Sequence, residues 1–323
     1  MTCCRFHGPA AEDHTATAVL VGMPKADKFQ LFPIMGGKYH LVDKILELMP
    51  PHNTYIEPFG GALTVFLNKP RVPNEVVNDW NKELANLYHV VRDHCDELIE
   101  RLTPLWYHRG IYEEWKAEYF LGLMPDNPVE RAARYFYILN SCFNGDLRGG
   151  WKHSPQKNFG VPILIKRDLL PRISERFQGV QIECRDALEV IKDYDSEDAC
   201  LYIDPPYAGI TRDVQLKLGY TYYGDRFTHE DHVKLAEILH SIKGKVILSY
   251  YPSDLVDELY PDFYRYEYRL VKMSAHRIPG RRKEEVTELL LLNYRPEDIP
   301  KQLAFSEMKV TEVVEFEEES TDT

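Results

Sequence analysis

A candidate catalytic corner is formed by four consecutive residues: Asp204, Pro205, Pro206 and Tyr207. It follows an apolar β-type run, 199–203, and the prolines must end that strand because they lack N–H donors and fix φ. In an open α/β sheet, ligands bind at the carboxyl ends of the strands. There, Asp204 and the Pro205 carbonyl can accept both N–H bonds of an exocyclic amine, and Tyr207 can stack on a flat base. The corner alone is therefore equally compatible with methylation of a base amine and with a proline-capped strand that ends in an exposed acid.

A weaker candidate for ligand contact is the triplet of Gly36, Gly37 and Lys38. Glycines let a ligand approach the backbone closely, and Lys38 adds a cation. Most such triplets are ordinary loops, and this one lacks the GxxxxGK[ST] spacing of a P-loop. The triplet alone is therefore a weak signal.

The segment 54–67 predicts a strand, a glycine turn and a helical run over 63–67. The residues of the turn are Glu57, Pro58, Phe59, Gly60 and Gly61. Small residues in such a turn let a cofactor lie against the backbone at a helix N-terminus. The spacing is not GxGxxG, so it does not support a nicotinamide cofactor.

Asp79 ends the second predicted strand, which begins near Glu75. It lies about 20 residues after the glycine turn, the separation at which an acid holds the ribose hydroxyls of a cofactor in this type of fold. The alternative is that Asp79 caps a helix over 82–91. The preceding glycine turn favours the ribose role.

Length and composition set the broad class. The chain has 323 residues, enough for one large domain or for a domain with a substantial insert. No run approaches the roughly 20 apolar residues of a membrane span, and residues 1–30 lack the apolar region of a secretory signal. The six cysteines are scattered without a CxxC pair, so we expect a cytoplasmic protein with reduced thiols and no metal site. The net charge of −12 argues weakly against a nucleic-acid partner but says little about local patches.

Alternating strand and helix patterns indicate an α/β fold. Leu41, Ile45 and Leu48 predict an amphipathic helix that ends before Pro50. Further strands are expected at 180–184, 199–203, 246–250, 264–272 and 286–292, and further helices at 168–177, from 188 and from 229. The helix from 229 is expected to begin with a capping box at Thr228. A loop is expected at 219–224, beside the corner, and the acidic tail from 307 is expected to be solvated.

The pattern changes between 96 and 165, where aromatic-rich helical segments, 98–105 and 130–139, precede a glycine-rich loop over 140–151. From 131 to 172 there are eight Lys or Arg against two acids, although the whole chain is acidic. Such an excess is typical of phosphate contacts, and the alternative is a solvated basic face. The candidate nucleic-acid contacts here are Asn144, Arg148 and Lys152.

A second basic stretch, 265–283, has seven Lys or Arg against one acid. It leads into the last predicted strand, and its candidate phosphate contacts are Arg277, Arg281 and Arg282. The two stretches could hold a duplex from both sides of the Asp204 corner.

The order of these motifs resembles that of the Dam-type DNA adenine-N6 methyltransferases. The glycine-lysine triplet, the Glu57–Gly61 turn, Asp79, a long insert and the Asp204–Tyr207 corner follow one another as they do in that family. Residues 227–232 and the strand 286–290 are also similar to the family's segments after the catalytic loop. The likeness covers about Phe29 to Tyr294 and excludes both ends of the chain.

The resemblance implies a Rossmann-like methyltransferase sheet that binds S-adenosyl-L-methionine, with an inserted, mainly helical target-recognition domain. It implies a catalytic domain of 29–95 and 166–296, an insert of 96–165, an extension of 1–28 and an acidic tail of 297–323. Ile34 and Lys38 would lie near the methionine part of the cofactor, and Asp79 would hold the ribose. Asp186 and Ala187 would border the adenine, and Asp204 would lie between cofactor and substrate.

Three positions depart from the family pattern. Leu63 stands where a third glycine is common, Ile34 replaces an aromatic residue, and Ala187 replaces a phenylalanine. These three positions belong to the segments expected to contact the cofactor, and the catalytic residues Asp204 to Tyr207 match the family pattern.

The implied reaction is methyl transfer to the N6 amine of an adenine flipped out of duplex DNA, without a metal ion. One alternative is an RNA or protein-side-chain methyltransferase of the same chemistry, against which the long basic insert argues. Another is a non-catalytic DNA-binding protein on a decayed methyltransferase scaffold, against which the intact corner argues. Neither the recognised DNA sequence nor the oligomeric state follows from the sequence.

Overall fold

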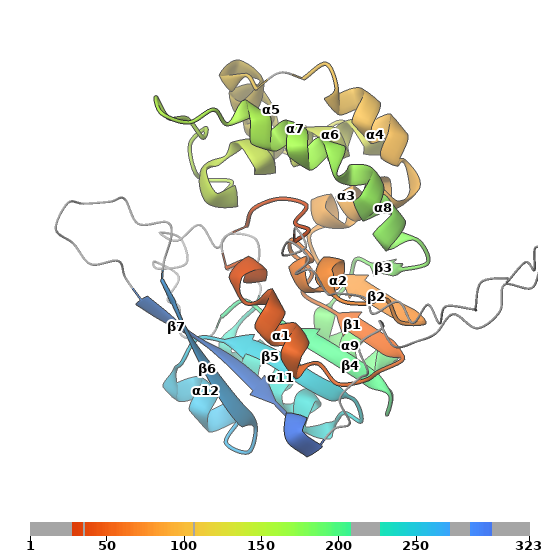
Figure 1. Cartoon of the computed structure of the whole chain (residues 1–323), viewed down its shortest axis with the longest axis vertical. Helices are drawn as coiled ribbons and strands as arrows, with labels where there is room; N and C mark the ends of the chain where they lie inside the picture. Colours follow the sequence, from red (N-terminus) through yellow and green to blue (C-terminus); the bar gives the residue numbers. More distant parts are fainter. Residues whose placement is uncertain (1–27, 35, 106, 208–226, 272–284, 299–323) are drawn as a thin grey trace, which may run out of the picture.

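Strands from both halves of the chain form one mixed sheet (Figure 1). Their bounds are β1 Thr54–Glu57, β2 Asn74–Asn78, β3 Gln181–Glu183, β4 Ala199–Ile203, β5 Lys245–Tyr250, β6 Tyr264–Val271 and β7 Glu285–Leu292. The seven strands lie in the order β3-β2-β1-β4-β5-β7-β6, and β7 is antiparallel to both of its neighbours. The computed structural model describes residues 28–34, 36–105, 107–207, 227–271 and 285–298.

The helices of the described residues surround this sheet. Their bounds are η1 Lys38–His40, α1 Val42–Leu48, α2 Thr64–Asn68, α3 Lys82–Asp93, α4 Cys95–Leu102, α5 Arg109–Leu121, α6 Pro128–Ser141, η2 Phe143–Gly145, α7 Gly160–Asp168, α8 Leu170–Phe177, α9 Ala187–Tyr194, α11 His229–Ser241, α12 Asp254–Leu259 and η3 Pro296–Asp298. One apolar core joins α1, α2 and α3 to one face of the sheet, and the other joins α9, α11 and α12 to the opposite face. Successive side chains of a strand point to opposite faces of the sheet, so in β1 Tyr55 belongs to the first core and Ile56 to the second.

The strand order reverses between β1 and β4. These strands are parallel neighbours in the middle of the sheet, and the chain continues from β1 to β2 on one side and from β4 to β5 on the other. All five residues of β4 are buried, as expected for a parallel strand that is covered on both faces. The carboxyl ends of the two strands lead into the Glu57–Gly61 turn and the Asp204 corner. This switch point is where open α/β sheets bind ligands.

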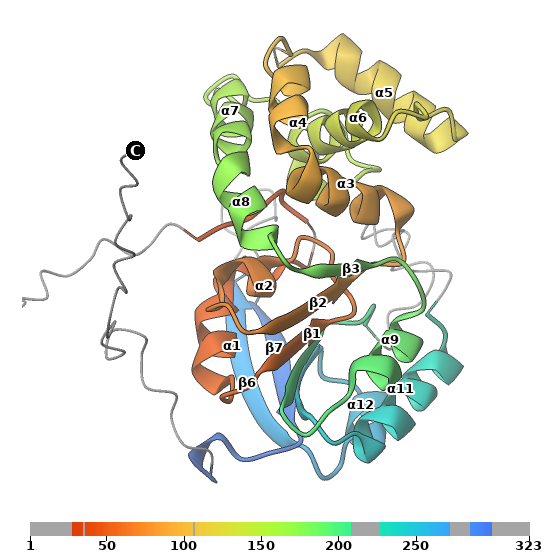
Figure 2. The same ribbon diagram turned by 90° about the vertical axis from the view of Figure 1, so that its right-hand side faces the viewer.

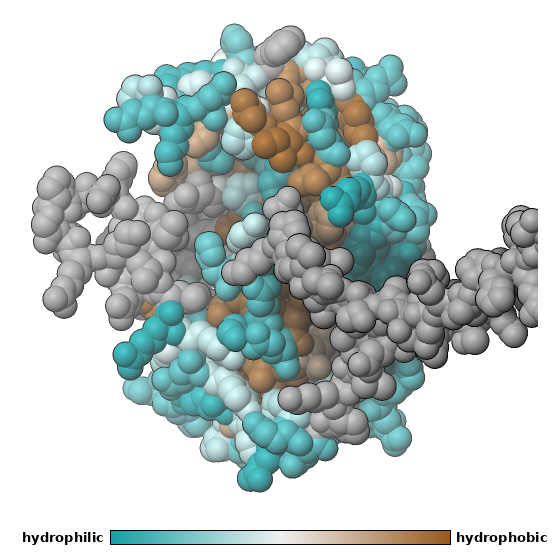
Figure 3. All heavy atoms as spheres, viewed as in Figure 1, coloured by the Kyte–Doolittle hydropathy of each residue, from teal (hydrophilic) through white to brown (hydrophobic). Residues whose placement is uncertain are grey.

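A helical layer lies beyond one end of the sheet (Figure 2). In it, α6 packs against α3, α4, α5 and α7, and α8 packs against α3 and α4. The helix α5 is not among the predicted helices, and the predicted boundaries at 96 and 165 fall inside α4 and α7. Apolar side chains also gather on the surface of this layer, in the upper half of Figure 3. Its exposed apolar residues include Phe120, Leu121, Val161 and Ile165.

Several local predictions are confirmed. The helix expected after Leu41 is α1, and it ends before Pro50. The capping box expected at Thr228 begins α11, with Asp231 as its reciprocal partner. The loop expected at 219–224 and the acidic tail lie outside the described residues. No helix in the described part of the chain is long and apolar enough to cross a membrane.

The helical layer touches the N-terminal segment at Gly145, where η2 ends with a φ of 69°. A Cβ atom at this position would lie 1.8 Å from the carbonyl oxygen of Pro33 and 2.9 Å from the Cα of Ile34. Gly145→Ala should therefore lower the free energy of unfolding by about 2–4 kcal/mol, because the loop must shift away and the left-handed backbone is strained. Denaturant unfolding measures this loss. Gly150→Ala is the control, since a Cβ there meets nothing within 4 Å, and equal losses in both variants would contradict the prediction.

Candidate active site

The end of β4 places the Asp204 side chain in contact with the buried amine of Lys38. The Lys38 Nζ atom lies 2.8 Å from each carboxylate oxygen of Asp204 and 2.8 Å from the carbonyl oxygen of Gly36. The Asp204 side chain is 23% exposed, so it can still face a ligand, whereas Lys38 is only 4% exposed. The structure thus brings the glycine-lysine triplet and the Asp204 corner into one site.

A residue that the sequence reasoning missed, Glu288 of β7, completes this cluster. Its Oε1 atom lies 3.2 Å from Lys38 Nζ and accepts hydrogen bonds from the hydroxyls of Tyr207 and Ser249. Glu288 is buried. The available signal was a single acid within the apolar strand 286–292, because a charged residue is rarely buried without a partner.

The electrostatics of the cluster favour an ion pair. Burial disfavours the charged form of Lys38, but the carboxylates of Asp204 and Glu288 outweigh it and hold the pKa of Lys38 above its ordinary value. Burial raises the pKa of Asp204, and the Lys38 cation acts against this rise. Burial and the neighbouring carboxylates also raise the pKa of Tyr207, so its hydroxyl remains a donor to Glu288.

The ring of Tyr207 is held from several sides. It is 7% exposed, and its centroid lies 4.3 Å from that of Tyr251 in an edge-on arrangement. Pro205 is buried and Pro206 half-buried beside it. Stacking of Tyr207 on a substrate base stays a prediction, and the contacts in the structure give this ring an anchoring role at the corner.

The Glu57–Gly61 turn is held to the second strand by Asp79, which is completely buried. The two carboxylate oxygens of Asp79 accept hydrogen bonds from the amides of Gly61 and Asn81, each at 2.8 Å. The alternative that Asp79 caps α3 is wrong, because the side chain of Asn81 is the N-cap and accepts from the Glu83 amide at 2.9 Å. Asp79 therefore sets the shape of the glycine turn.

Other residues predicted for the cofactor converge on the same turn. The Ile34 Cδ1 atom is 3.7 Å from the position that a Cβ of Gly61 would take, and Gly37 donates to the Ile34 carbonyl at 3.1 Å. Asn78, which sequence reasoning missed, donates its side-chain amide to the carbonyls of Pro58 and Arg185 at 2.8 Å and 3.1 Å. Phe59 is buried in the second core, and Gly60 leaves no room for a Cβ, which would lie 2.8 Å from the Asn78 carbonyl oxygen.

Leu63, at the position where the family pattern has a third glycine, adopts a left-handed backbone with φ 50° and ψ 36°. Among the described residues it is the one non-glycine residue with positive φ. This conformation costs an ordinary residue roughly 1–2 kcal/mol. The buried Leu63 side chain offsets that cost through its packing in the first core.

Glu57, the last residue of β1, closes the N-terminus of α2. Its Oε2 atom accepts hydrogen bonds from the Tyr55 hydroxyl at 2.7 Å and from the Phe66 amide at 3.0 Å. Leu63, which occupies the N-cap position, has an apolar side chain that cannot accept a hydrogen bond from the helix amides. Burial, and to a smaller extent the charge of Asp204, raise the pKa of Glu57 from 4.5 to about 8 against these two hydrogen bonds.

This raised pKa predicts a pH-dependent stability. Between pH 4.5 and about 8 the folded chain keeps a proton on Glu57 that the unfolded chain has lost, so the free energy of unfolding falls as pH rises. Glu57→Gln should remove this component, which amounts to roughly 3–5 kcal/mol across the window. Denaturant unfolding at pH 5 and pH 8, without ligand, measures the difference. Glu97→Gln, at an exposed position, should keep the wild-type slope, and a wild-type slope in Glu57→Gln would refute the assignment.

A cavity of about 1070 Å³ lies between the end of the sheet and the helical layer. Its lining residues are Trp80, Asn81, Lys82, Tyr119, Phe120, Leu147, Cys184, Arg185, Asp186 and Glu189. Asp186, predicted to border the cofactor adenine, is the N-cap of α9 and accepts from the Leu188 amide at 2.7 Å. Ala187 is the first residue of that helix, and Trp80 is 43% exposed. The cavity thus offers an aromatic ring and polar groups to a flat heterocycle.

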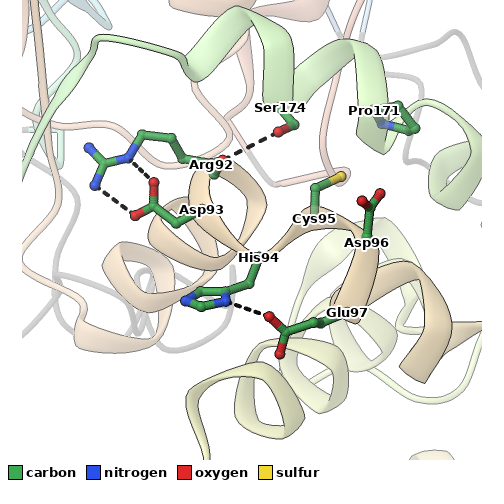
Figure 4. A pocket seen from close by; sticks show the side chains of 8 residues that line it. All are labelled: Arg92, Asp93, His94, Cys95, Asp96, Glu97, Pro171 and Ser174. Atoms are coloured by element: carbon green, nitrogen blue, oxygen red, sulfur yellow. Dashed lines mark hydrogen bonds and ion pairs between the residues drawn. The ribbon is translucent and has the colours of Figure 1, made fainter.

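A second cavity, of about 390 Å³, lies where α3 and α4 meet α8 (Figure 4). Among its lining side chains, Arg92 pairs with Asp93, and His94 pairs with Glu97 at 2.7 Å. The carbonyl of Arg92 accepts from the Ser174 hydroxyl. It contains none of the predicted site residues. In the described part of the chain, no group of three or more His, Cys, Asp or Glu side chains is placed to hold a metal ion.

The predicted DNA contacts fall into different environments. Arg148 is exposed in the loop after η2, which contains Asn144. Lys152 is half-buried, and its amine donates to the Asn140 carbonyl at 3.3 Å. Arg277, Arg281 and Arg282 lie outside the described residues.

Part of the basic excess at 131–172 is neutralised by acids of α3, α5 and α6. Arg131 Nε donates to Glu83 at 2.8 Å, and Arg134 pairs with Glu118 and Glu130. These two arginines therefore hold helices of the layer together, and the local count of charges overstates the positive surface.

Known proteins share this arrangement of motifs. Residues 35–273 match the family described as D12 class N6 adenine-specific DNA methyltransferase. The chain is 32% identical over 278 residues to the Type II methyltransferase M1.LlaDCHI of Lactococcus lactis subsp. cremoris, which covers 80% of this chain and 93% of the relative. It is 28% identical over 288 residues to the Type II methyltransferase M.MjaIII of Methanocaldococcus jannaschii, with 80% and 96% covered. It is also 28% identical over 274 residues to the DNA adenine methylase of Escherichia coli, with 81% and 93% covered.

The family match spans the glycine-lysine triplet, the Glu57–Gly61 turn, Asp79 and the Asp204 corner, which the fold assembles at one end of the sheet. The seven-stranded sheet fits a Rossmann-like methyltransferase fold. The expected family is therefore confirmed over both alternatives: the chain belongs to the D12 class N6 adenine-specific DNA methyltransferases.

Proposed function

We propose that this methyltransferase uses S-adenosyl-L-methionine and acts on an adenine that has been flipped out of double-stranded DNA. The observation that carries the proposal is the half-exposed Asp204 carboxylate, which Lys38 holds at the switch point of the sheet. A carboxylate at this point can face both a ligand on the glycine turn and a base entering from outside.

The residues present fit the cofactor. The Gly60–Gly61 turn, which Asp79 braces, offers a close backbone approach, and Ile34 lies against Gly61. Trp80 and Asp186 line a cavity whose size and chemistry suit a nucleoside. When bound, S-adenosyl-L-methionine supplies a methyl group activated by a sulfonium sulfur.

The chain's own contribution is to position the amine. The adenine N6 lone pair is delocalised into the ring, so the free amine is a poor nucleophile. Asp204 and the carbonyl of Pro205 would accept the two N–H bonds and favour the pyramidal nitrogen, whose lone pair would form the new N–C bond. The electrons of the broken methyl–sulfur bond would stay on the sulfur, and the methylated nitrogen would become neutral by losing one proton to water. Holding both partners in near-attack geometry is worth about 7–11 kcal/mol. Flipping the base costs a few kcal/mol, for which stacking can compensate in part.

The direct test is transfer of tritiated methyl from labelled S-adenosyl-L-methionine to duplex DNA, single-stranded DNA and RNA of matched sequence. We expect label on the N6 of adenine, and most in the duplex. Label in RNA alone, or in none of the three, would overturn the proposal. Methylation-sensitive sequencing of DNA from an expressing host that lacks other methylases would then give the recognised sequence. If no sequence motif is methylated consistently in that DNA, the result would argue against site specificity.

A cytoplasmic location stays a prediction.

We also propose that the loop after η2 contributes to sequence recognition through Arg148. This side chain is exposed, and an arginine that reaches a base edge favours guanine. Arg148→Ala should relax the preference at one base pair by about 1–3 kcal/mol, measured as affinity for the cognate site against single-base variants. Lys157→Ala, which removes another exposed cation of the layer, should weaken all sequences equally. If Arg148→Ala also weakens every sequence equally, this assignment is wrong.

A further inference from the structure

We propose that Glu288 of β7 is a positioning residue that also sets the charge of the site: with Lys38 and Asp204, it forms a cluster whose excess negative charge complements the sulfonium cation of the cofactor. This inference rests on the proposed use of S-adenosyl-L-methionine. It assigns a role to a residue outside the predicted motifs.

The contacts of Glu288 converge on one oxygen. Its Oε1 atom accepts the Tyr207 hydroxyl and the Ser249 hydroxyl, the latter at 3.1 Å, and lies 3.2 Å from Lys38 Nζ. Glu288 therefore holds the aromatic end of the corner and the cation that contacts Asp204. Because its side chain is only 6% exposed, these contacts are shielded from water, and each is stronger than on a surface.

The charges of the cluster do not cancel. Lys38 supplies one positive charge, and Asp204 and Glu288 supply two negative charges. Tyr207 and Ser249 are neutral donors to Glu288. Glu57, the next acid toward β1, has its pKa raised to about 8 by burial and is largely neutral at pH 7. One negative charge therefore remains within a mostly buried site.

An excess buried charge is costly unless a partner of opposite sign binds it. A structural ion pair would need only one acid for Lys38, and a neutral acceptor could serve the hydroxyls of Tyr207 and Ser249, so the packing of the corner does not require the second negative charge. The sulfonium of S-adenosyl-L-methionine is permanently positive, whereas the thioether that remains after methyl transfer is neutral. A site with one negative charge in excess therefore favours the methyl donor over the spent product.

The test compares the affinities of these two ligands by calorimetry. In Glu288→Gln, which keeps the shape and removes the charge, affinity for S-adenosyl-L-methionine should fall by about tenfold or more. Affinity for S-adenosylhomocysteine should change less than about threefold, because its sulfur carries no charge. The readout is the ratio of the two affinities, which a general loss of structure does not change.

Two variants separate charge from hydrogen bonding. Ser249→Ala removes one donor to Glu288 without changing any charge, and Glu288→Asp keeps the charge on a shorter side chain. Both should keep the wild-type affinity ratio within about threefold. If Glu288→Gln weakens the two ligands equally, or Ser249→Ala changes the ratio as much as Glu288→Gln does, the charge role is overturned.

Asp204→Asn keeps the test available if Glu288→Gln does not fold. It removes the same unit charge from the half-exposed member of the cluster, so the affinity ratio should shift in the same direction. An unchanged ratio in Asp204→Asn would refute the charge argument for the whole cluster. A wild-type chain that binds neither ligand would instead refute the proposed cofactor, which is a separate result.

Discussion

Asp204→Ala is expected to lower the rate of methyl transfer to duplex DNA by at least about 100-fold while the chain stays folded. The carboxylate is the half-exposed acceptor at the end of β4, and removing it leaves the substrate amine with one acceptor fewer. Lys38 keeps Glu288 as a partner, at 3.2 Å, so the buried cation is not left alone. Single-turnover transfer at saturating DNA and cofactor measures the effect on the chemical step.

The control for this variant is Asp96→Ala, which removes an exposed acid from the second cavity. It should transfer methyl groups at the wild-type rate, since that cavity lies where α3 and α4 meet α8, away from the corner. An Asp204→Ala chain that keeps more than about a tenth of the rate, a loss below roughly 1.4 kcal/mol, would remove Asp204 from the mechanism.

Asp79→Ala should weaken the binding of S-adenosyl-L-methionine by about 10- to 100-fold and slow turnover at saturating cofactor much less. The carboxylate accepts the amides of Gly61 and Asn81 inside a buried turn, and each amide left without a partner costs about 1–3 kcal/mol. A loss of binding shared by ground state and transition state raises KM and leaves kcat nearly unchanged. Calorimetry and saturation kinetics on the same chain separate the two quantities.

A ribose-modified ligand distinguishes direct contact from bracing of the turn. If Asp79 holds the ribose hydroxyls, a cofactor analogue without those hydroxyls should bind wild type and Asp79→Ala with similar affinity. If Asp79 only braces the turn through Gly61, the losses from the variant and from the analogue should add. Wild-type affinity of Asp79→Ala for the natural cofactor would contradict both roles.

Local chemistry determined much of this protein from the sequence alone. Two prolines after an apolar run must end a strand, so the corner at Asp204 follows from the chain itself. The capping box at Thr228 and the apolar stripe of α1 act within one or two helical turns, and both are present. The succession of strands and helices, together with the order of motifs, was sufficient for the fold class and the family.

The prediction of the helical layer was incomplete. Tyr112, Trp115 and Tyr119 recur at the i, i+3, i+7 spacing of one helix face, but α5 was not predicted; it packs against α6. The basic excess at 131–172 predicted phosphate contacts, but Arg131 and Arg134 pair with Glu83, Glu118 and Glu130, which precede the counted stretch. A count along the chain cannot show which partner a long side chain reaches.

Tertiary structure alone decided how the site is joined. Lys38 and Asp204 are 166 positions apart and meet because β4 lies in the middle of the sheet, where the segment after Gly36 crosses its carboxyl end. Glu288 joins them because β7 lies beside β5 and places the buried Glu288 side chain toward the corner. Strand order depends on how whole faces pack, and no short-range pattern encodes it. The sequence therefore determined which chemical groups are present, and the packing of the sheet decided which of them lie together in one charged cluster.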